Sequence, residues 1–352
     1  MRARNFGAEA GFAADLDACR GALRGGSKTF FAASLILPGN VRGPATALYA
    51  FCRAVDDAID LAPEPARALD TVRRRLRRIY DGGPFDDAVD RCFAETVERF
   101  AIPRALPEAL VEGFEWDAER RRYPDLDALY AYGARVAGAV GAMMAILMGA
   151  RGAETYARAC ELGVAMQLTN IARDVGEDAR LGRLYLPLDR MRAAGLDPDV
   201  FLARPRFDDR VARVVGDVLD AADALYARGV SGIAALPAGC RPAIRAAAFL
   251  YAEIGREVAR RGFDSISGRA VVAPSRKAAV LLRATLAPPG APSGPGPAPL
   301  PAIAPLAEAA SLSRRPVPAP PPAWWRLHAR AERMIVLFER LAEREQYGNG
   351  GD

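Results

Sequence analysis

Histidine, lysine and paired cysteine are scarce in this 352-residue chain, and the scarcity of histidine and of cysteine pairs each excludes a class of chemistry. The only histidine, His328, stands far from every other candidate site residue, so a catalytic imidazole is not expected. The five cysteines are scattered without a CxxC pair, which argues against a zinc site or a disulfide framework and suits a reducing cytoplasm. Lysine occurs only at positions 28 and 277. Because the arginines are interspersed with acidic residues, the net charge of +5 does not predict nucleic-acid binding.

Nucleotide-binding loops, strand patterns and long hydrophobic runs are also missing. No GxGxxG or Walker-type loop occurs, so neither NAD(P)H nor ATP is expected to take part. The most apolar stretch, 136–150, has about fifteen residues between two arginines, short of the roughly 20 that span a membrane. Acidic residues interrupt the first twenty positions, so a signal peptide is not expected. Helical periodicity before Ala287, without any alternating pattern, predicts an all-α fold.

Proline divides the chain. Thirteen of the 27 prolines fall within 287–322, which predicts a flexible linker without a packed core between a helical domain, 1–286, and a C-terminal segment, 323–352. That last segment reads as a basic amphipathic helix opened by Trp324 and Trp325. Docking onto the body is the commoner explanation for such a helix, and binding to a membrane surface is the alternative.

Two acidic motifs, Asp56-Asp57-Ala58-Ile59-Asp60 and Asn170 through Asp178, are the most informative feature of the sequence. Groups at i, i+3 or i+4, i+7 and i+11 share one face of a helix. The first face consists of Tyr49, Arg53, Asp56 and Asp60. The second face consists of Gln167, Asn170, Asp174 and Asp178. The sequence therefore predicts two helices with the same polar stripe.

Acidic side chains one turn apart repel each other, by roughly 0.2–0.5 kcal/mol per pair in an isolated helix, so these stripes need a cation. Mg²⁺ is commonly held by one or two carboxylates together with substrate phosphates. A solvated charged face is the alternative for either motif alone. The apolar residues that alternate with the acids, such as Val55 and Val175, favour buried helices and a divided metal-diphosphate site.

The sequence segments around these motifs resemble those of a known family. They are Ser27-Lys28-Thr29-Phe30-Phe31, the run from Ala47 to Asp57, Arg135 to Gly141, and the run from Gln167 to Pro187. In this order, over roughly residues 20–283, they resemble the squalene/phytoene synthase family, most closely its bacterial phytoene synthases. The resemblance implies the isoprenoid synthase fold: a single helical domain around a central apolar cavity, with two aspartate-rich helices at its mouth.

The resemblance also implies roles for individual residues. It assigns metal binding to Asp56, Asp60, Asn170, Asp174 and Asp178, with Mg²⁺ as the expected ion and Mn²⁺ as a substitute. It assigns contact with diphosphate, or lining of the pocket, to Ser27, Tyr49, Arg53, Gln167, Asn170, Arg173, Arg183, Tyr185, Tyr251 and Arg269. Asp56, Asp60, Asp174, Asp178 and Tyr185 would form the catalytic set, with Asp57 and Glu177 supporting the metal ligands. An ion pair within the helix is an equal alternative for Arg53 and for Arg173.

The activity implied is a Mg²⁺-dependent, head-to-head condensation of two geranylgeranyl diphosphates through prephytoene diphosphate to phytoene, in carotenoid biosynthesis. Synthases that use farnesyl diphosphate to make dehydrosqualene, hydroxysqualene or squalene are the nearest alternative, because the acidic motifs recognise the head of the substrate and not its tail. A terpene cyclase and a non-catalytic helical binding protein stay open behind them. Small side chains in 136–147 would either leave room for isoprenoid chains or allow close helix packing.

The chemistry of this reaction also suggests where the protein works. Substrate and product are very apolar, so we expect a cytoplasmic protein in peripheral contact with the inner face of the membrane. There it would hand its product to the next carotenoid enzyme.

Overall fold

The computed structural model describes residues 12, 14–21, 36–286 and 297–313, and within these ranges it contains helices and no strand. The N-terminal part of the body contains α3 (Gly39–Asp60), α4 (Pro65–Tyr80), α5 (Ala88–Phe100) and α6 (Ala105–Ala118). Next come α7 (Leu126–Gly133), the π-helix Ala134–Gly138, α8 (Ala139–Met148) and α9 (Ala153–Arg180). The predicted all-α fold is confirmed.

The second half of the body begins with two short helices, α10 (Leu188–Ala193) and α11 (Pro198–Ala203). Long helices come after them: α12 (Asp209–Ser231), the 3₁₀ turn Gly232–Ala235, α13 (Arg241–Arg260) and α14 (Pro274–Leu286). Aspartates cap several of these helices. The Asp208 carboxylate, for example, accepts from the backbone N–H groups of Arg210 and Val211 and so fixes the start of α12.

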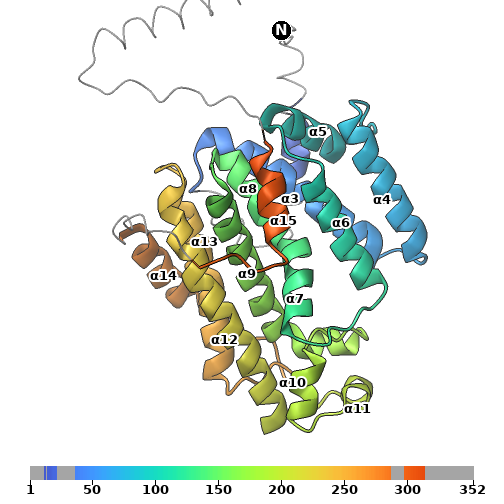
Figure 1. The fold of residues 1–352 in the computed structure, drawn as a ribbon, viewed down its shortest axis with the longest axis vertical. Coiled ribbons are helices and arrows are strands. Elements are labelled where there is room, and N and C mark those ends of the chain that lie inside the picture. Colours follow the sequence, from blue (N-terminus) through green and yellow to red (C-terminus); the bar gives the residue numbers. More distant parts are fainter. Residues whose placement is uncertain (1–11, 13, 22–35, 287–296, 314–352) are drawn as a thin grey trace, which may run out of the picture. The chain divides into compact units, whose positions relative to one another are not determined.

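Helix α9 is the centre of the described body. It packs against α8, α12, α13 and α15, which surround it in Figure 1. The crossing with the preceding helix is close, because a Cβ on Gly141 would lie less than 3.0 Å from the carbonyl of Ala159, and one on Gly163 equally near that of Ala137. Only glycine allows the two backbones to approach this far.

A π-helix, Ala134–Gly138, interrupts the long helical stretch from Leu126 to Met148. A π-turn adds a residue to the helix and rotates the turns after it, and such turns are frequent at functional sites. By length and composition this stretch is the one candidate membrane span in the described residues, but 67% of its most apolar window is buried inside the protein. A core helix of a folded body accounts for that apolar character.

The predicted linker is wrong for residues 297–313. Here α15 (Ala304–Ser311) packs against α6, α8 and α9 and is drawn in orange-red in Figure 1. Ile303 is fully buried, and Leu306, Ala307 and Ala310 are also in the core. Proline is tolerated in a first helical turn, and Pro305 stands there, so a proline-rich composition did not exclude this helix. The predicted C-terminal helix, 323–352, lies outside the described residues.

Buried charge fixes this segment to the body. Glu161 is fully buried in α9 and pairs with Arg158 at 2.5 Å and with Arg228 of α12. Each arginine also donates to the segment, Arg158 to the carbonyl of Pro297 and Arg228 to that of Ala298 at 2.6 Å. The segment is therefore an integral part of the helical domain.

Candidate active site

The polar stripe of α3 lies opposite a buried apolar stripe. Phe51, Val55 and Ile59 face the core, whereas the side chains of Asp56 and Asp60 are 36% and 35% exposed. Arg53 pairs with Asp57 at 2.6 Å and more loosely with Asp56 at 3.3 Å. The alternative reading of Arg53 as a partner in an intrahelical ion pair therefore describes this structure.

The C-terminal half of α9 repeats the arrangement. Ile171 and Val175 are buried, and Asp174 shares the half-buried face with Asn170 and Gln167, whose amides lie 3.4 Å apart. Arg173 donates two hydrogen bonds to Asp174, at 2.5 and 2.7 Å, so it too forms a pair within its helix.

Two further arginines connect distant segments to these acids. Arg183, just after α9, donates to Asp60 of α3 at 2.5 and 3.3 Å and so joins the two acidic helices. Arg269 reaches Asp174 at 2.9 Å from the loop after α13, and it lies 3.8 Å from Glu177. The structure thus brings the two halves of the predicted site together.

Two carboxyl groups of the acidic motifs, those of Asp56 and Asp178, carry raised pKa values. Burial, followed by the charge of neighbouring Asp60, raises the pKa of Asp56 to about 6. Burial, followed by the charge of Asp174, raises the pKa of Asp178 to about 7. Both causes disfavour the charged form, so a cation at this place would be strongly favoured.

Divalent metal binding fits this donor set when phosphate oxygens complete it. Among the residues that the structure describes, no three carboxylate, histidine or cysteine side chains could hold a metal ion by themselves. Mg²⁺ demands oxygen ligands and usually takes one or two carboxylates plus substrate phosphates, not an all-protein cage. Asp56 and Asp60 form a pair of acids on α3, and Asp174 and Asp178 form a pair on α9. Together with the amide oxygen of Asn170, these pairs meet that requirement.

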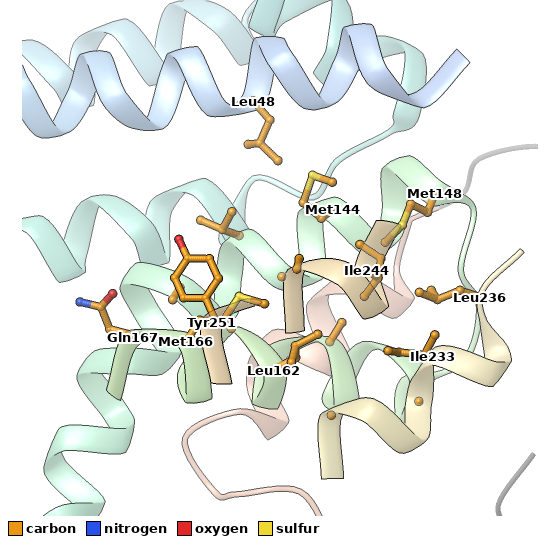
Figure 2. A pocket seen from close by; sticks show the side chains of 18 of the residues that line it. Leu48, Met144, Met148, Leu162, Met166, Gln167, Ile233, Leu236, Ile244 and Tyr251 are labelled. Atoms are coloured by element: carbon orange, nitrogen blue, oxygen red, sulfur yellow. The ribbon is translucent and has the colours of Figure 1, made fainter. Parts of the chain in front are cut away.

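An apolar cavity begins beside the acidic helices. Polar side chains of Tyr49, Gln167, Asn170 and Tyr251 line the end nearest the acids. Leu236, Ile233 and Met148 line the opposite end, as Figure 2 shows for the labelled side chains. The wall follows α9 from Asn170 to Thr155, which is fifteen residues or about 22 Å at 1.5 Å per residue. Val136, Ala137, Val140 and Gly141 form another part of the wall, so the small residues both allow close packing and border the cavity.

Comparison with known proteins agrees with this geometry. The squalene/phytoene synthase family model matches residues 23–277. The chain belongs to the squalene/phytoene synthase family. It is 50% identical over 320 residues to a phytoene synthase of Cereibacter sphaeroides, covering 86% of this chain and 89% of the relative. A phytoene synthase of Rhodobacter capsulatus is 52% identical over 267 residues, 75% of this chain and 79% of the relative.

Solved structures of the family share the fold. A dehydrosqualene synthase in complex with a ligand superposes with a TM-score of 0.72 at 29% identity, covering 78% of this chain and 96% of the other. A squalene synthase from Alicyclobacillus acidocaldarius superposes with a TM-score of 0.66 at 26% identity, covering 72% and 95%. The isoprenoid synthase fold is thereby confirmed. The family consists of enzymes that transfer prenyl groups from prenyl diphosphates and generally depend on a divalent metal.

The family motifs did not single out Asp117, which the structure places behind the acidic helices. This residue near the end of α6 accepts hydrogen bonds from the hydroxyls of Tyr185, at 2.7 Å, and Tyr132, at 2.9 Å. Burial raises the pKa of Asp117 to about 6, even though both tyrosines stabilise its charged form. The stacked ring of Tyr123 completes the cluster. Asp117 thus fixes Tyr185, two residues after Arg183.

The other predicted site residues line the cavity, lie at the acidic helices or fall outside the described residues. Tyr49, Gln167, Asn170 and Tyr251 line the cavity, and Arg269 is ion-paired at its acidic helices. Ser27 lies outside the described residues. Sequence reasoning missed Asp117. This residue stands in the segment Trp-Asp-Ala-Glu, which carries no periodic or motif signal by itself.

Proposed function

We propose that this protein is a phytoene synthase, which joins two molecules of geranylgeranyl diphosphate head to head through prephytoene diphosphate. The observation that carries the proposal is the continuity of one site, in which paired acids and arginines stand beside an apolar cavity whose wall follows α9 for about 22 Å. A twenty-carbon prenyl chain has sixteen carbons along its length, and the zigzag of bonds of about 1.5 Å spans about 19 Å from end to end when extended. Such a chain fits beside α9 with its diphosphate at the acidic helices.

The side chains divide the work of ionising an allylic diphosphate. Asp56, Asp60, Asn170, Asp174 and Asp178 would hold Mg²⁺, or Mn²⁺ in its place. When bound, the ion neutralises the negative charge that develops on the leaving diphosphate. Arg183 and Arg269 supply planar guanidinium groups that can bind diphosphate oxygens bidentately.

The cavity controls the fate of the carbocation. In the first half-reaction, the carbon–oxygen bond of one substrate breaks with release of diphosphate, and the double bond of the second substrate attacks the cation. The new cation then loses a proton as the cyclopropane of prephytoene diphosphate closes. In the second, that diphosphate departs, the ring rearranges and a proton is lost. Apolar walls such as Met144 and Ile244 exclude water, which would otherwise capture the cation as an alcohol. Released diphosphate, or water bound by a tyrosine, accepts the proton.

Product analysis tests this proposal directly. We would incubate the purified full chain with Mg²⁺ and either geranylgeranyl or farnesyl diphosphate, without nicotinamide, and identify hydrocarbons by chromatography and mass spectrometry. A forty-carbon product from geranylgeranyl diphosphate is expected. A thirty-carbon product from farnesyl diphosphate alone would keep the family and change the substrate, whereas a cyclic twenty-carbon product would indicate a cyclase. Absence of any diphosphate release would favour a binding protein.

Two substitutions test the metal assignment. Asp60→Ala and Asp174→Ala should each abolish turnover while the helical content, measured by circular dichroism, persists. Turnover retained in either variant would refute the role of that carboxylate as a metal ligand.

We further propose a cytoplasmic protein in peripheral contact with the inner face of the membrane, where it hands its product to the next carotenoid enzyme. The support is chemical, because the prenyl tails and the hydrocarbon product partition into lipid. Flotation with anionic liposomes tests the contact. Loss of binding on deletion from Ala323 onward would assign it to the C-terminal segment, and unchanged binding would exclude that segment.

A further inference from the structure

The arginines that the family resemblance assigns to diphosphate are paired, in this structure, with carboxylates that it assigns to metal. The two terminal nitrogens of Arg183 donate hydrogen bonds to the two carboxylate oxygens of Asp60. Arg269 contacts Asp174 through Nε at 2.9 Å and through Nη2 at 3.2 Å. The arginines assigned to diphosphate and the carboxylates assigned to metal are therefore bound to each other in this structure.

Arg183 and Arg269 are held by well-defined backbone. The segment that carries Arg183 begins at Gly182, in the left-handed region with φ of 73°, and Tyr185 after it is fixed by Asp117. The loop that carries Arg269 is held to α9 by the N–H of Gly176, which donates to the Ser265 carbonyl at 2.9 Å. The backbone therefore holds both arginines next to the acidic helices.

The pairs are also accessible enough to exchange. The side chains of Arg183 and Asp60 are 24% and 35% exposed, and that of Arg269 is 53% exposed. Asp174, the partner of Arg269, is 16% exposed, so solvent reaches each pair from at least one side chain, and screening by solvent weakens such pairs. A carboxylate oxygen that accepts from a guanidinium has less electron density to offer a divalent cation, and a guanidinium directed at a carboxylate has fewer donors for a phosphate.

We propose that Arg183 and Arg269 exchange partners during binding: each leaves its aspartate when the carboxylate takes a divalent cation, and its freed donors then bind the diphosphate. The idea rests on the proposed prenyl-diphosphate chemistry. It makes binding of the metal and binding of the diphosphate reinforce each other through the protein, in addition to their direct contact. Because linkage is reciprocal, each ligand raises the affinity for the other by the same factor.

Charge alone would act differently. Removal of a positive charge at the mouth strengthens metal binding and weakens diphosphate binding, but it leaves their mutual coupling factor unchanged. Partner exchange predicts that the coupling factor itself falls. Arg180, in the last turn of α9, offers a control for charge and for the position of the loop, because it donates not to a carboxylate but to the backbone carbonyl of Ile266, at 2.7 Å, in the loop that carries Arg269.

The experiment uses the full chain with Mn²⁺ and inorganic diphosphate as probes. Titration calorimetry would measure the affinity for each probe alone and in the presence of the other, corrected for the complex that the two form in solution. The variants are R183Q, R269Q and R180Q, with circular dichroism to check the fold. We expect the coupling factor to fall by up to about fivefold, the worth of one partly exposed ion pair, in R183Q and in R269Q, and to stay at the wild-type value in R180Q.

Two results would overturn the proposal: a coupling factor that is unchanged in both R183Q and R269Q, or one that falls equally in all three variants. An unchanged factor would show that these arginines act only through their charge, and an equal fall in all three variants would show that the coupling does not depend on the pairs with Asp60 and Asp174. Should R183Q fail to fold, R269Q alone decides between the two outcomes. Because no prenyl substrate is used, a wild type that shows the coupling but makes no hydrocarbon would refute the proposed function and leave partner exchange standing.

Discussion

The substitution Gly176→Ala should show whether tight packing around α9 outweighs the higher helix propensity of alanine. A Cβ at this position would lie 2.8 Å from both the Cα and the carbonyl oxygen of Ile266, and 2.9 Å from the carbonyl of Ser265. All three are backbone atoms, which cannot rotate away as a side-chain end could. The loop that carries Arg269 would therefore have to move away from α9.

The size of the effect depends on opposing contributions. Overpacking costs about 1–3 kcal/mol, and loss of the hydrogen bond from Gly176 to Ser265 adds about 1 kcal/mol. Replacement of glycine by alanine inside a helix returns about 1 kcal/mol. The net expectation is a destabilisation of about 1–3 kcal/mol together with a raised KM for the prenyl diphosphate, because the moved loop carries Arg269 away from the acidic helices.

Gly216 provides the matched control. It is also a helix-interior glycine, in α12, but a Cβ there would lie 3.8 Å from the ring of Phe263, an ordinary contact. Gly216→Ala should therefore stabilise the protein by up to about 1 kcal/mol and leave KM unchanged. Urea denaturation and steady-state kinetics on both variants make the comparison. Equal stability of the two variants, or an unchanged KM in Gly176→Ala, would refute the reasoning.

Two other buried carboxylates yield further predictions. Because the folded-state pKa of Asp117 is about 6, against about 3.8 when unfolded, the folded protein binds the extra proton between these values, so stability relative to Asp117→Asn should fall as the pH rises from about 4 to 6. Parallel pH profiles of urea stability would contradict this. Glu161→Gln leaves two arginines without their charged partner and should cost about 3–5 kcal/mol, with faster proteolysis at 297–313. An unchanged melting temperature would show that this cluster does not anchor the segment.

Helical spacing was sufficient to predict the two acidic faces. Asp56 and Asp60 share a face with Arg53 because the period of the α-helix dictates it, and Phe51 and Val55 are buried opposite them for the same reason. Such inferences need only local geometry. The sequence could therefore predict both stripes, although neither stripe reveals that Arg183 connects them.

Features that depend on tertiary contact were not predictable. Asp117 acquires its partners only when the end of α6 meets the segment after α9, and no local pattern indicates that meeting. The segment 297–313 misled in the opposite way, because proline and alanine suggested an unpacked linker. Alanine is small enough to pack closely on α8 and α9, and one buried isoleucine, Ile303, together with Leu306 is enough to hold a short helix there.

The placement of the acids along their helices is itself an argument for a cation. Asp60 is the last residue of α3, and Asp178 stands in the last turn of α9. The C-terminal end of a helix carries partial negative charge, so an acidic side chain there is disfavoured. Burial and like charges disfavour ionisation of Asp178 further, as its raised pKa shows. Natural sequences break such local rules mainly at functional sites. In the described structure Arg183 and Arg269 supply part of the positive charge that the acids need. They can do so only while they are not bound to a diphosphate. A divalent cation that binds together with the diphosphate resolves this conflict, because it neutralises the acids at the moment the arginines turn to the phosphate oxygens.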